Sequence, residues 1–225
     1  TGPNTIISNY GTSRKITISD DPLTLVQTLN DLLFSSLAKE KLAEYHLPFL
    51  AGAVGYFSYD LGRRFEKLPS NAVKDIHQPD MAVGIYSHAV IYDRTTGGYQ
   101  LVAPKDKTDA LLQEIEKLVA NNAITEEFSL TSDWQANMSK LSYQAKFEQV
   151  QRYLLSGDCY QINLAQRFTS QYKGNEFKAY TALRKQNKGP FSAFIRLDSL
   201  AILSVSPERF LQLVDNKVQT KPIKG

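Results

Sequence analysis

The sequence predicts an α+β fold with antiparallel sheets. Helical periodicities and strand alternations arrive in clusters, without the regular β-α-β-α order of a parallel sheet. A turn rich in Asp, Thr and Gly at 93–98 separates two apolar segments and predicts a β-hairpin. The chain has 225 residues, 42% of them apolar, which is enough to form a hydrophobic core.

The first part of the chain contains a strand, a well-marked helix and then a hairpin. Residues 15–18 alternate as a strand does. Asp21 followed by Pro22 indicates a helix start, and leucines at helical spacing predict a helix over 22–38. The remaining elements expected here are a core strand with close backbone approach within 51–62, a turn or short helix near 62–66, strands at 81–92 and 99–103, and a helix from 108 or 109.

The second part starts after a polar segment, 121–137, that we expect to be a loop. Ser139 or Ser142 is the predicted start of the next helix, and Gly157 its end. The elements expected after it are a strand at 159–168, a helix at 177–186, and strands at 190–196, 201–205, 209–214 and 217–220.

Composition excludes several classes of protein. The net charge is only +3 and no basic stripe is visible, which disfavours a nucleic-acid binder. The single cysteine, Cys159, excludes a disulfide framework, and the three histidines have no zinc-ligand spacing. No window approaches the roughly 18 apolar residues of a membrane span. The chain begins without a methionine or a signal peptide, so we interpret it as part of a longer protein from a reducing compartment, the cytoplasm.

Two residues are candidates for catalysis. Lys224 lies between Ile223 and Gly225, where partial burial would lower its pKa and make it nucleophilic, although a lysine at a strand end is usually solvated. Glu208 follows an apolar strand and a proline and is a candidate for proton transfer, although this segment alone favours a surface Glu–Arg pair. Cys159 has no histidine nearby in the sequence, so we expect a small buried residue there.

Four segments, taken together, carry a family signal: GAVGYFSYD at 52–60, SGDCYQINL at 156–164, SVSPERF at 204–210 and TKPIKG at 220–225. With them the chain resembles the chorismate-utilising enzymes over nearly its whole length. Within that family it resembles the aminodeoxychorismate synthase branch, because Lys224 stands where the anthranilate synthase branch typically has alanine.

This resemblance implies a fold and a reaction. The antiparallel sheets would pack face to face with helices outside, as in anthranilate synthase component I, and the fold would be incomplete. Chorismate and ammonia would give 4-amino-4-deoxychorismate, on the route to 4-aminobenzoate and folate. Lys224 would attack C2 of chorismate and form a covalent adduct, while Glu208 would act as general acid and base for the departing 4-hydroxyl.

The resemblance also implies partners and a cofactor. A glutamine amidotransferase subunit would supply the ammonia, and Mg²⁺ would help to hold the chorismate dicarboxylate, with its ligands outside these residues. Pro190, Phe191 and Ser192 fall on a motif with which some family members bind tryptophan. We expect 1–130 to form an N-terminal region and 131–225 the start of the chorismate-binding region. Without the rest of the site, we expect these 225 residues alone to be inactive.

Two other functions remain open from the sequence. One is an anthranilate synthase-like enzyme, whose product is fluorescent and has lost the pyruvyl group that aminodeoxychorismate keeps. The other is a non-catalytic module that binds tryptophan or docks a glutaminase.

Overall fold

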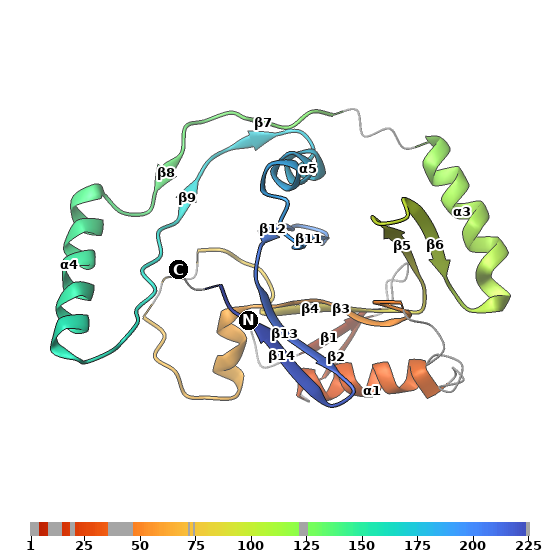
Figure 1. Cartoon of the computed structure of the whole chain (residues 1–225), viewed down its shortest axis with the longest axis horizontal. Coiled ribbons are helices and arrows are strands. Elements are labelled where there is room, and N and C mark those ends of the chain that lie inside the picture. Colours follow the sequence, from red (N-terminus) through yellow and green to blue (C-terminus); the bar gives the residue numbers. More distant parts are fainter. Residues whose placement is uncertain are drawn as a thin grey trace. The chain divides into compact units, whose positions relative to one another are not determined.

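The computed structural model confirms the antiparallel α+β class in the residues that it describes. These are 5–8, 15–18, 21–35, 47–71, 73, 75–121 and 126–223. The chain divides into two compact units, Thr1–Asn122 and Ala123–Gly225, which are described here one at a time (Figure 1). Each described strand pairs antiparallel with one other strand.

In its described residues, the first unit contains three antiparallel strand pairs and two α-helices. The pairs are β1 (Thr5–Ser8) with β2 (Lys15–Ile18), β3 (Gly52–Phe57) with β4 (Met81–Tyr86), and β5 (Ala89–Asp93) with β6 (Gly98–Val102). The helices are α1 (Pro22–Ser35) and α3 (Thr108–Asn121), and two short 3-10 helices are η1 (Tyr59–Arg64) and η2 (Lys105–Lys107). Among the helices of the described segments, none has the length and apolar character needed to cross a membrane.

Helix α1 begins as the Asp21–Pro22 pair predicts. The Asp21 carboxylate accepts hydrogen bonds from the Thr24 backbone N–H at 2.9 Å and from its hydroxyl at 2.8 Å. The helix packs against β3 and β4. Gly52, with φ +129°, permits this approach, because a Cβ there would lie 3.1 Å from Asn30 Oδ1.

Strand β3 confirms one expectation and corrects another. The close backbone approach is present, since a Cβ on Gly55 would lie 2.1 Å from the carbonyl oxygen of Ala82 in β4. The expectation of a core strand is wrong for most of β3, because Val54 and Phe57 are about half exposed. Its sheet has only two strands, and a two-stranded sheet leaves side chains uncovered.

The predicted strand at 81–92 is two strands. The chain turns at Ser87 and His88, so that β4 pairs with β3 while β5 pairs with β6. The hairpin turn at 93–98 is confirmed, with the Asp93 carboxylate accepting the Thr95 N–H at 2.8 Å. The periodicity therefore located the apolar residues but not the bend between the two pairs.

Between residues 126 and 223, the second unit contains four strand pairs and two helices. Helix α4 (Lys140–Ser156) starts at Ser139, whose hydroxyl accepts the Ser142 N–H at 3.1 Å, and ends at Gly157 in the left-handed conformation, as expected. The other elements are β7 (Ser129–Leu130) with β10 (Tyr172–Lys173), β8 (Gln135–Ala136) with β9 (Phe168–Thr169), α5 (Glu176–Asn187), β11 (Phe191–Arg196) with β12 (Ala201–Ser206), and β13 (Arg209–Val214) with β14 (Lys217–Lys221).

Two expectations for this unit are corrected. The segment 121–137 is not all loop, because it contributes the short strands β7 and β8. The expected strand at 159–168 is reduced to its end, β9, and residues 159–167 are described without strand structure. Alternation makes a segment able to form a strand, but a strand forms only where another strand supplies hydrogen bonds.

The best-packed part of the second unit is an aromatic cluster between α5 and β11–β12. The Tyr180 side chain is 7% exposed. Its ring lies 5.5 Å from that of Phe194, and the Phe177 ring meets Phe194 edge-on at 5.1 Å between centroids. Such aromatic contacts add roughly 0.5–1.5 kcal/mol each beyond simple burial. This cluster fixes β11–β12 against α5.

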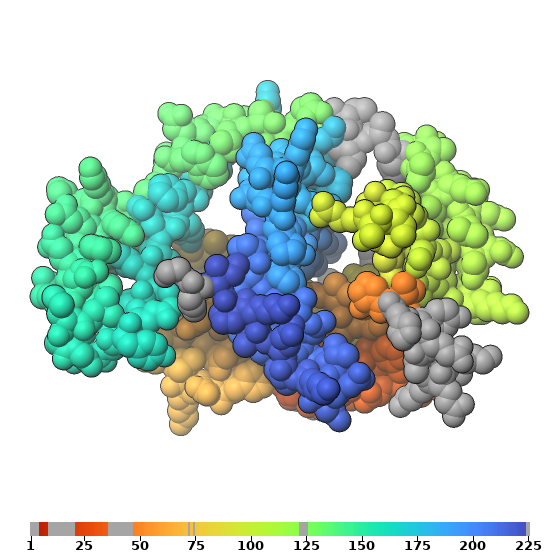
Figure 2. Space-filling model, in the orientation of Figure 1, coloured from red at the N-terminus to blue at the C-terminus, as the bar shows by residue number. Residues whose placement is uncertain are grey.

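The β13–β14 hairpin, in contrast, has little cover in the described residues. Phe210 and Val218 are 83% and 68% exposed, and Leu211 and Leu213 are also exposed. Figure 2 shows one face of this dark blue hairpin open to view. An isolated two-stranded hairpin is only marginally stable in water, so apolar side chains on both faces indicate a strand pair that belongs inside a larger sheet structure.

A carboxylate at the start of α5 gives the second unit a predictable response to acid. Glu176 accepts a hydrogen bond from the Tyr172 hydroxyl at 2.5 Å and one from Arg196 at 2.7 Å. These donors, Tyr172 first, lower the pKa of Glu176 from 4.5 to about 2. The stabilisation is therefore complete above pH 4.5 and is lost as the pH falls from 4.5 toward 2.

We expect acid to destabilise the second unit through this group by about 1–2 kcal/mol, allowing for solvent screening. Urea unfolding of the 225-residue chain between pH 2 and pH 6 measures it. Glu176→Gln should flatten the pH dependence, and Tyr172→Phe should move the loss to higher pH. A parent and a Glu176→Gln variant with the same pH dependence would contradict the assignment.

Candidate active site

The candidate site is a corner between two hairpins of the second unit. In the β11–β12 register, Phe191 lies opposite Ser206, so the segment 190–192 lies beside the end of β12. The chain then passes through Pro207 and Glu208 and enters β13 at Arg209. The two motifs found in the sequence at 190–192 and 204–210 are therefore neighbours in space.

The backbone of Glu208 is held by the preceding serine. The Ser206 hydroxyl accepts the Glu208 N–H at 3.2 Å and donates to the Glu208 carbonyl oxygen at 3.2 Å. Pro207 between them restricts the backbone further. The Glu208 side chain is exposed in the described structure, so its carboxyl is accessible to a ligand at this corner.

The β13–β14 register brings the two candidate catalytic segments to one end of the hairpin. Arg209, the first residue of β13, pairs with Lys221, the last residue of β14. Glu208 thus precedes β13 at the end where β14 finishes and the chain continues to Pro222 and Ile223. Lys224 itself lies outside the described residues, so its assigned role stays a prediction.

The three residues predicted to bind tryptophan lie at the start of β11, opposite the end of β12. The Ser192 hydroxyl donates to the Gly189 carbonyl oxygen at 2.6 Å. The Phe191 ring is 37% exposed, and the Arg209 guanidinium lies 5.3 Å from its centre. Pro190 forms the turn into β11. The structure thus places these residues together and beside Glu208; tryptophan binding stays a prediction.

Gly189 keeps this corner closed, and we expect Gly189→Ala to disrupt it. A Cβ at this position would lie 2.6 Å from the carbonyl oxygen of Val205 and 2.8 Å from that of Ser206. Because both are backbone atoms, the strand must move, at a cost of about 1–3 kcal/mol. Urea unfolding measures this cost. Gly62→Ala is the control, since its Cβ would meet only Leu68 at 3.9 Å; equal effects would contradict the expectation.

A hollow of about 520 Å³ lies elsewhere in the second unit, after α4. It is open, and Tyr160 at its rim is 96% exposed. Cys159 lines it and is half-buried, less buried than we expected. No histidine is among the residues that line the hollow, so the Cys159 thiol has no imidazole base beside it there. The other lining residues are Asp158, Gln161 and Asn163.

The described residues do not form a magnesium site. No group of three or more His, Cys, Asp or Glu side chains in the described segments is arranged to hold a metal ion. Magnesium prefers carboxylate and water oxygens in octahedral geometry, and Glu208 alone does not supply them. No chemical step is therefore assigned to a metal from these residues.

Arg209 is the site residue that the sequence did not single out. Its sequence context suggested only a charged neighbour of Glu208. The contact with Phe191, eighteen positions earlier, depends on the hairpin register and has no local sequence signal.

Comparison with known proteins matches the chain to a family and a fold. Residues 2–225 match the family described as chorismate binding enzyme. Aminodeoxychorismate synthase component 1 of Klebsiella aerogenes is 53% identical over 93% of this chain and 45% of that protein. The corresponding Escherichia coli K12 protein is 46% identical over all of this chain and 48% of its own length. The chain thus spans about half the length of the curated relatives it matches.

A solved structure gives the fold independently. Anthranilate synthase component I from Streptococcus pneumoniae TIGR4 superimposes with a TM-score of 0.75 at 21% identity, covering 95% of this chain and 50% of that chain. This confirms the expected fold class, in the incomplete form that we anticipated.

Proposed function

Because the chain belongs to the chorismate binding enzyme family, we propose that it supplies part of the active site of an enzyme that converts chorismate and ammonia into 4-amino-4-deoxychorismate. The observation that carries the proposal is the 53% and 46% identity to two aminodeoxychorismate synthase components. Lys224, where the anthranilate-forming branch typically has alanine, supports the same branch. In this proposal 131–225 form the start of the chorismate-binding region, and 1–130 form the N-terminal region.

The proposed chemistry uses the two ends that the hairpin register brings together. The Lys224 amine bonds to C2 of chorismate, the ring double bonds shift, and the C4–O bond breaks. Protonated Glu208 gives its proton to the departing hydroxyl, which leaves as water, because hydroxide is a poor leaving group. Ammonia then bonds to C4, the C2–N bond breaks, and the Glu208 carboxylate takes up the surplus proton. Covalent capture splits one difficult displacement into two easier steps.

The proposal includes partners and a cofactor. The relatives are named as component 1, which implies a further subunit, and we propose that it is a glutamine amidotransferase that provides ammonia. Mg²⁺, held by residues outside this chain, would neutralise part of the charge of the chorismate carboxylates. We place the enzyme in the cytoplasm.

A hybrid protein tests this function directly. Residues 1–225 replace the matching segment of the Escherichia coli relative, and the product is measured with chorismate, ammonium and magnesium. We expect 4-amino-4-deoxychorismate, which keeps the pyruvyl group, from the hybrid and no turnover from the 225 residues alone. Fluorescent anthranilate from the hybrid, or no product, would refute the proposed function, and robust activity of the 225 residues alone would refute the expectation of inactivity.

Tryptophan is the second ligand that we propose, at Pro190, Phe191 and Ser192. The partly exposed Phe191 beside the half-buried Ser192 supports an indole-binding surface. Calorimetry with tryptophan on the hybrid and on its Phe191→Ala variant tests it. Heat of binding in the parent that is lost in the variant is expected, and equal binding by both would contradict it.

A further inference from the structure

In the described residues, no sheet hydrogen bonds join the two site hairpins. There β11–β12 and β13–β14 are separate two-stranded sheets, connected through Pro207 and Glu208. Side-chain contacts across this junction therefore contribute to the angle at which the hairpins meet. Glu208 lies in the junction, so the same contacts bear on where its carboxyl lies.

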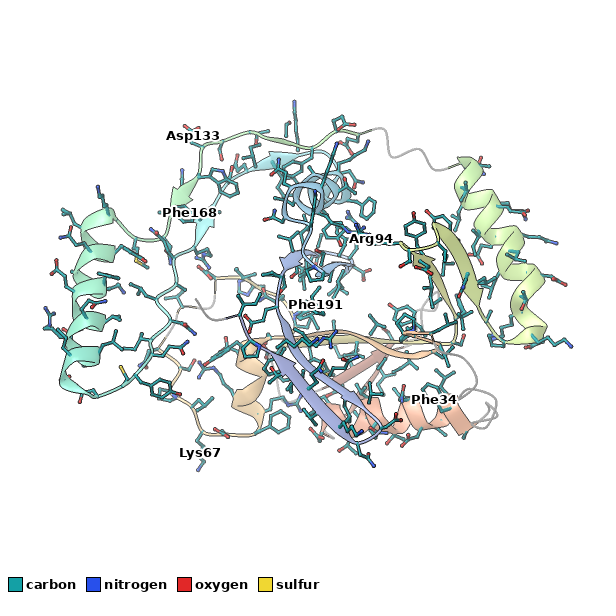
Figure 3. The ribbon with its side chains drawn as sticks, viewed as in Figure 1. Phe34, Lys67, Arg94, Asp133, Phe168 and Phe191 are labelled. Carbon is teal, nitrogen blue, oxygen red and sulfur yellow. The ribbon has the colours of Figure 1, made fainter. Side chains whose placement is uncertain are left out.

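Arg209 contacts Phe191 across the junction and two glutamines within its own hairpin. Its guanidinium carbon lies 5.3 Å from the centre of the Phe191 ring in β11. Figure 3 labels Phe191 among the side chains of the described residues. The guanidinium also donates to the side-chain oxygen of Gln219 in β14 at 2.7 Å and to that of Gln212 in β13. A planar guanidinium can stack on a ring and donate in its own plane at the same time. One side chain thus connects three strands.

The contacts of Arg209 complete the support of Glu208. On one side of Glu208, the Ser206 hydroxyl holds the Glu208 backbone. On the other side, the next residue, Arg209, is held by its side-chain hydrogen bond to Gln219. The β13–β14 register shifts between Arg209 and Gln212, which bends the start of β13. The Arg209 contacts lie across this irregularity, where ladder hydrogen bonds are interrupted.

We propose that Arg209 is a positioning residue that fixes the angle between the β11–β12 and β13–β14 hairpins, and with it the place of the Glu208 carboxyl. The inference rests on the proposed function for its catalytic consequence, but its structural part stands separately. Lysine is a poor replacement here, because it lacks the planar guanidinium, whose carbon lies over the Phe191 ring while its Nη1 donates to both glutamines.

The kinetic test uses the hybrid protein. In Arg209→Lys we expect kcat to fall at least tenfold while KM for chorismate changes less than threefold, because binding groups remain and the acid is misplaced. Phe191→Leu should lower kcat in the same way, and the double variant should lose little more than the worse single variant. The inference would be overturned if Arg209→Lys had the kinetics of the parent, or if its KM for chorismate rose by as large a factor as its kcat fell.

The structural test uses the 225-residue chain and amide hydrogen exchange. We expect Arg209→Ala to speed exchange in β14 and at Glu208 at least tenfold, while Arg184→Ala, an exposed arginine on α5, leaves both unchanged. Unchanged exchange in Arg209→Ala, or β14 amides unprotected in the parent, would overturn the inference. If the hybrid makes no aminodeoxychorismate, the proposed function fails, and the exchange experiment still decides the role of Arg209.

Discussion

Lys224→Ala in the hybrid protein is expected to abolish the covalent substrate adduct and to lower aminodeoxychorismate formation by on the order of 10³ or more. Alanine has no amine to bond to C2, so the route through an enzyme-bound intermediate is closed. Any remaining turnover should shift toward anthranilate, since the anthranilate-forming branch typically has alanine here. Mass spectrometry of the denatured protein after mixing with chorismate detects the adduct, and fluorescence detects anthranilate.

Lys217, the first residue of β14, provides the matched control. Lys217→Ala removes an exposed amine at the start of this strand. We expect it to keep the adduct and to change the rate by no more than about twofold, as surface substitutions generally do. An adduct of unchanged mass and yield in Lys224→Ala would exclude Lys224 as the nucleophile, whatever the effect on rate.

The second large effect is expected from Glu208→Gln, which should lower kcat by about 10²–10⁴, the usual contribution of a positioned general acid. The amide has the shape of the carboxyl but cannot supply a proton to the 4-hydroxyl. Adduct formation should slow together with turnover, because the same proton is needed in the first step. Stopped-flow mixing followed by quench and mass spectrometry measures the rate of adduct formation.

Two further variants serve as controls for Glu208→Gln. Glu208→Asp keeps the acid on a shorter side chain and should recover part of the lost rate. Glu116→Gln, on the exposed surface of α3, removes a carboxylate far along the chain and should leave kcat unchanged. A Glu208→Gln variant with kcat within a few-fold of the parent would show that another group protonates the leaving hydroxyl.

The structure differs most from the sequence-based prediction in segments that form a strand only when a second strand pairs with them. Residues 159–168 alternate as clearly as β11 does, yet only Phe168–Thr169 form a strand in the described structure. The segment 121–137 looks like a loop, yet β7 and β8 pair with β10 and β9. Alternation predicts which residues can form a strand, while hydrogen bonding to a distant segment decides whether they do.

By itself, the sequence determined the helix ends and the family. Helix starts at Asp21 and Ser139 and the helix end at Gly157 could be predicted, because caps act over three or four residues. Only the tertiary structure decided that Glu208 lies at the end of the hairpin where β14 finishes, and that the Arg209 guanidinium lies over the Phe191 ring. Strand register and such ring contacts depend on residues far apart in the chain, and no local pattern encodes them.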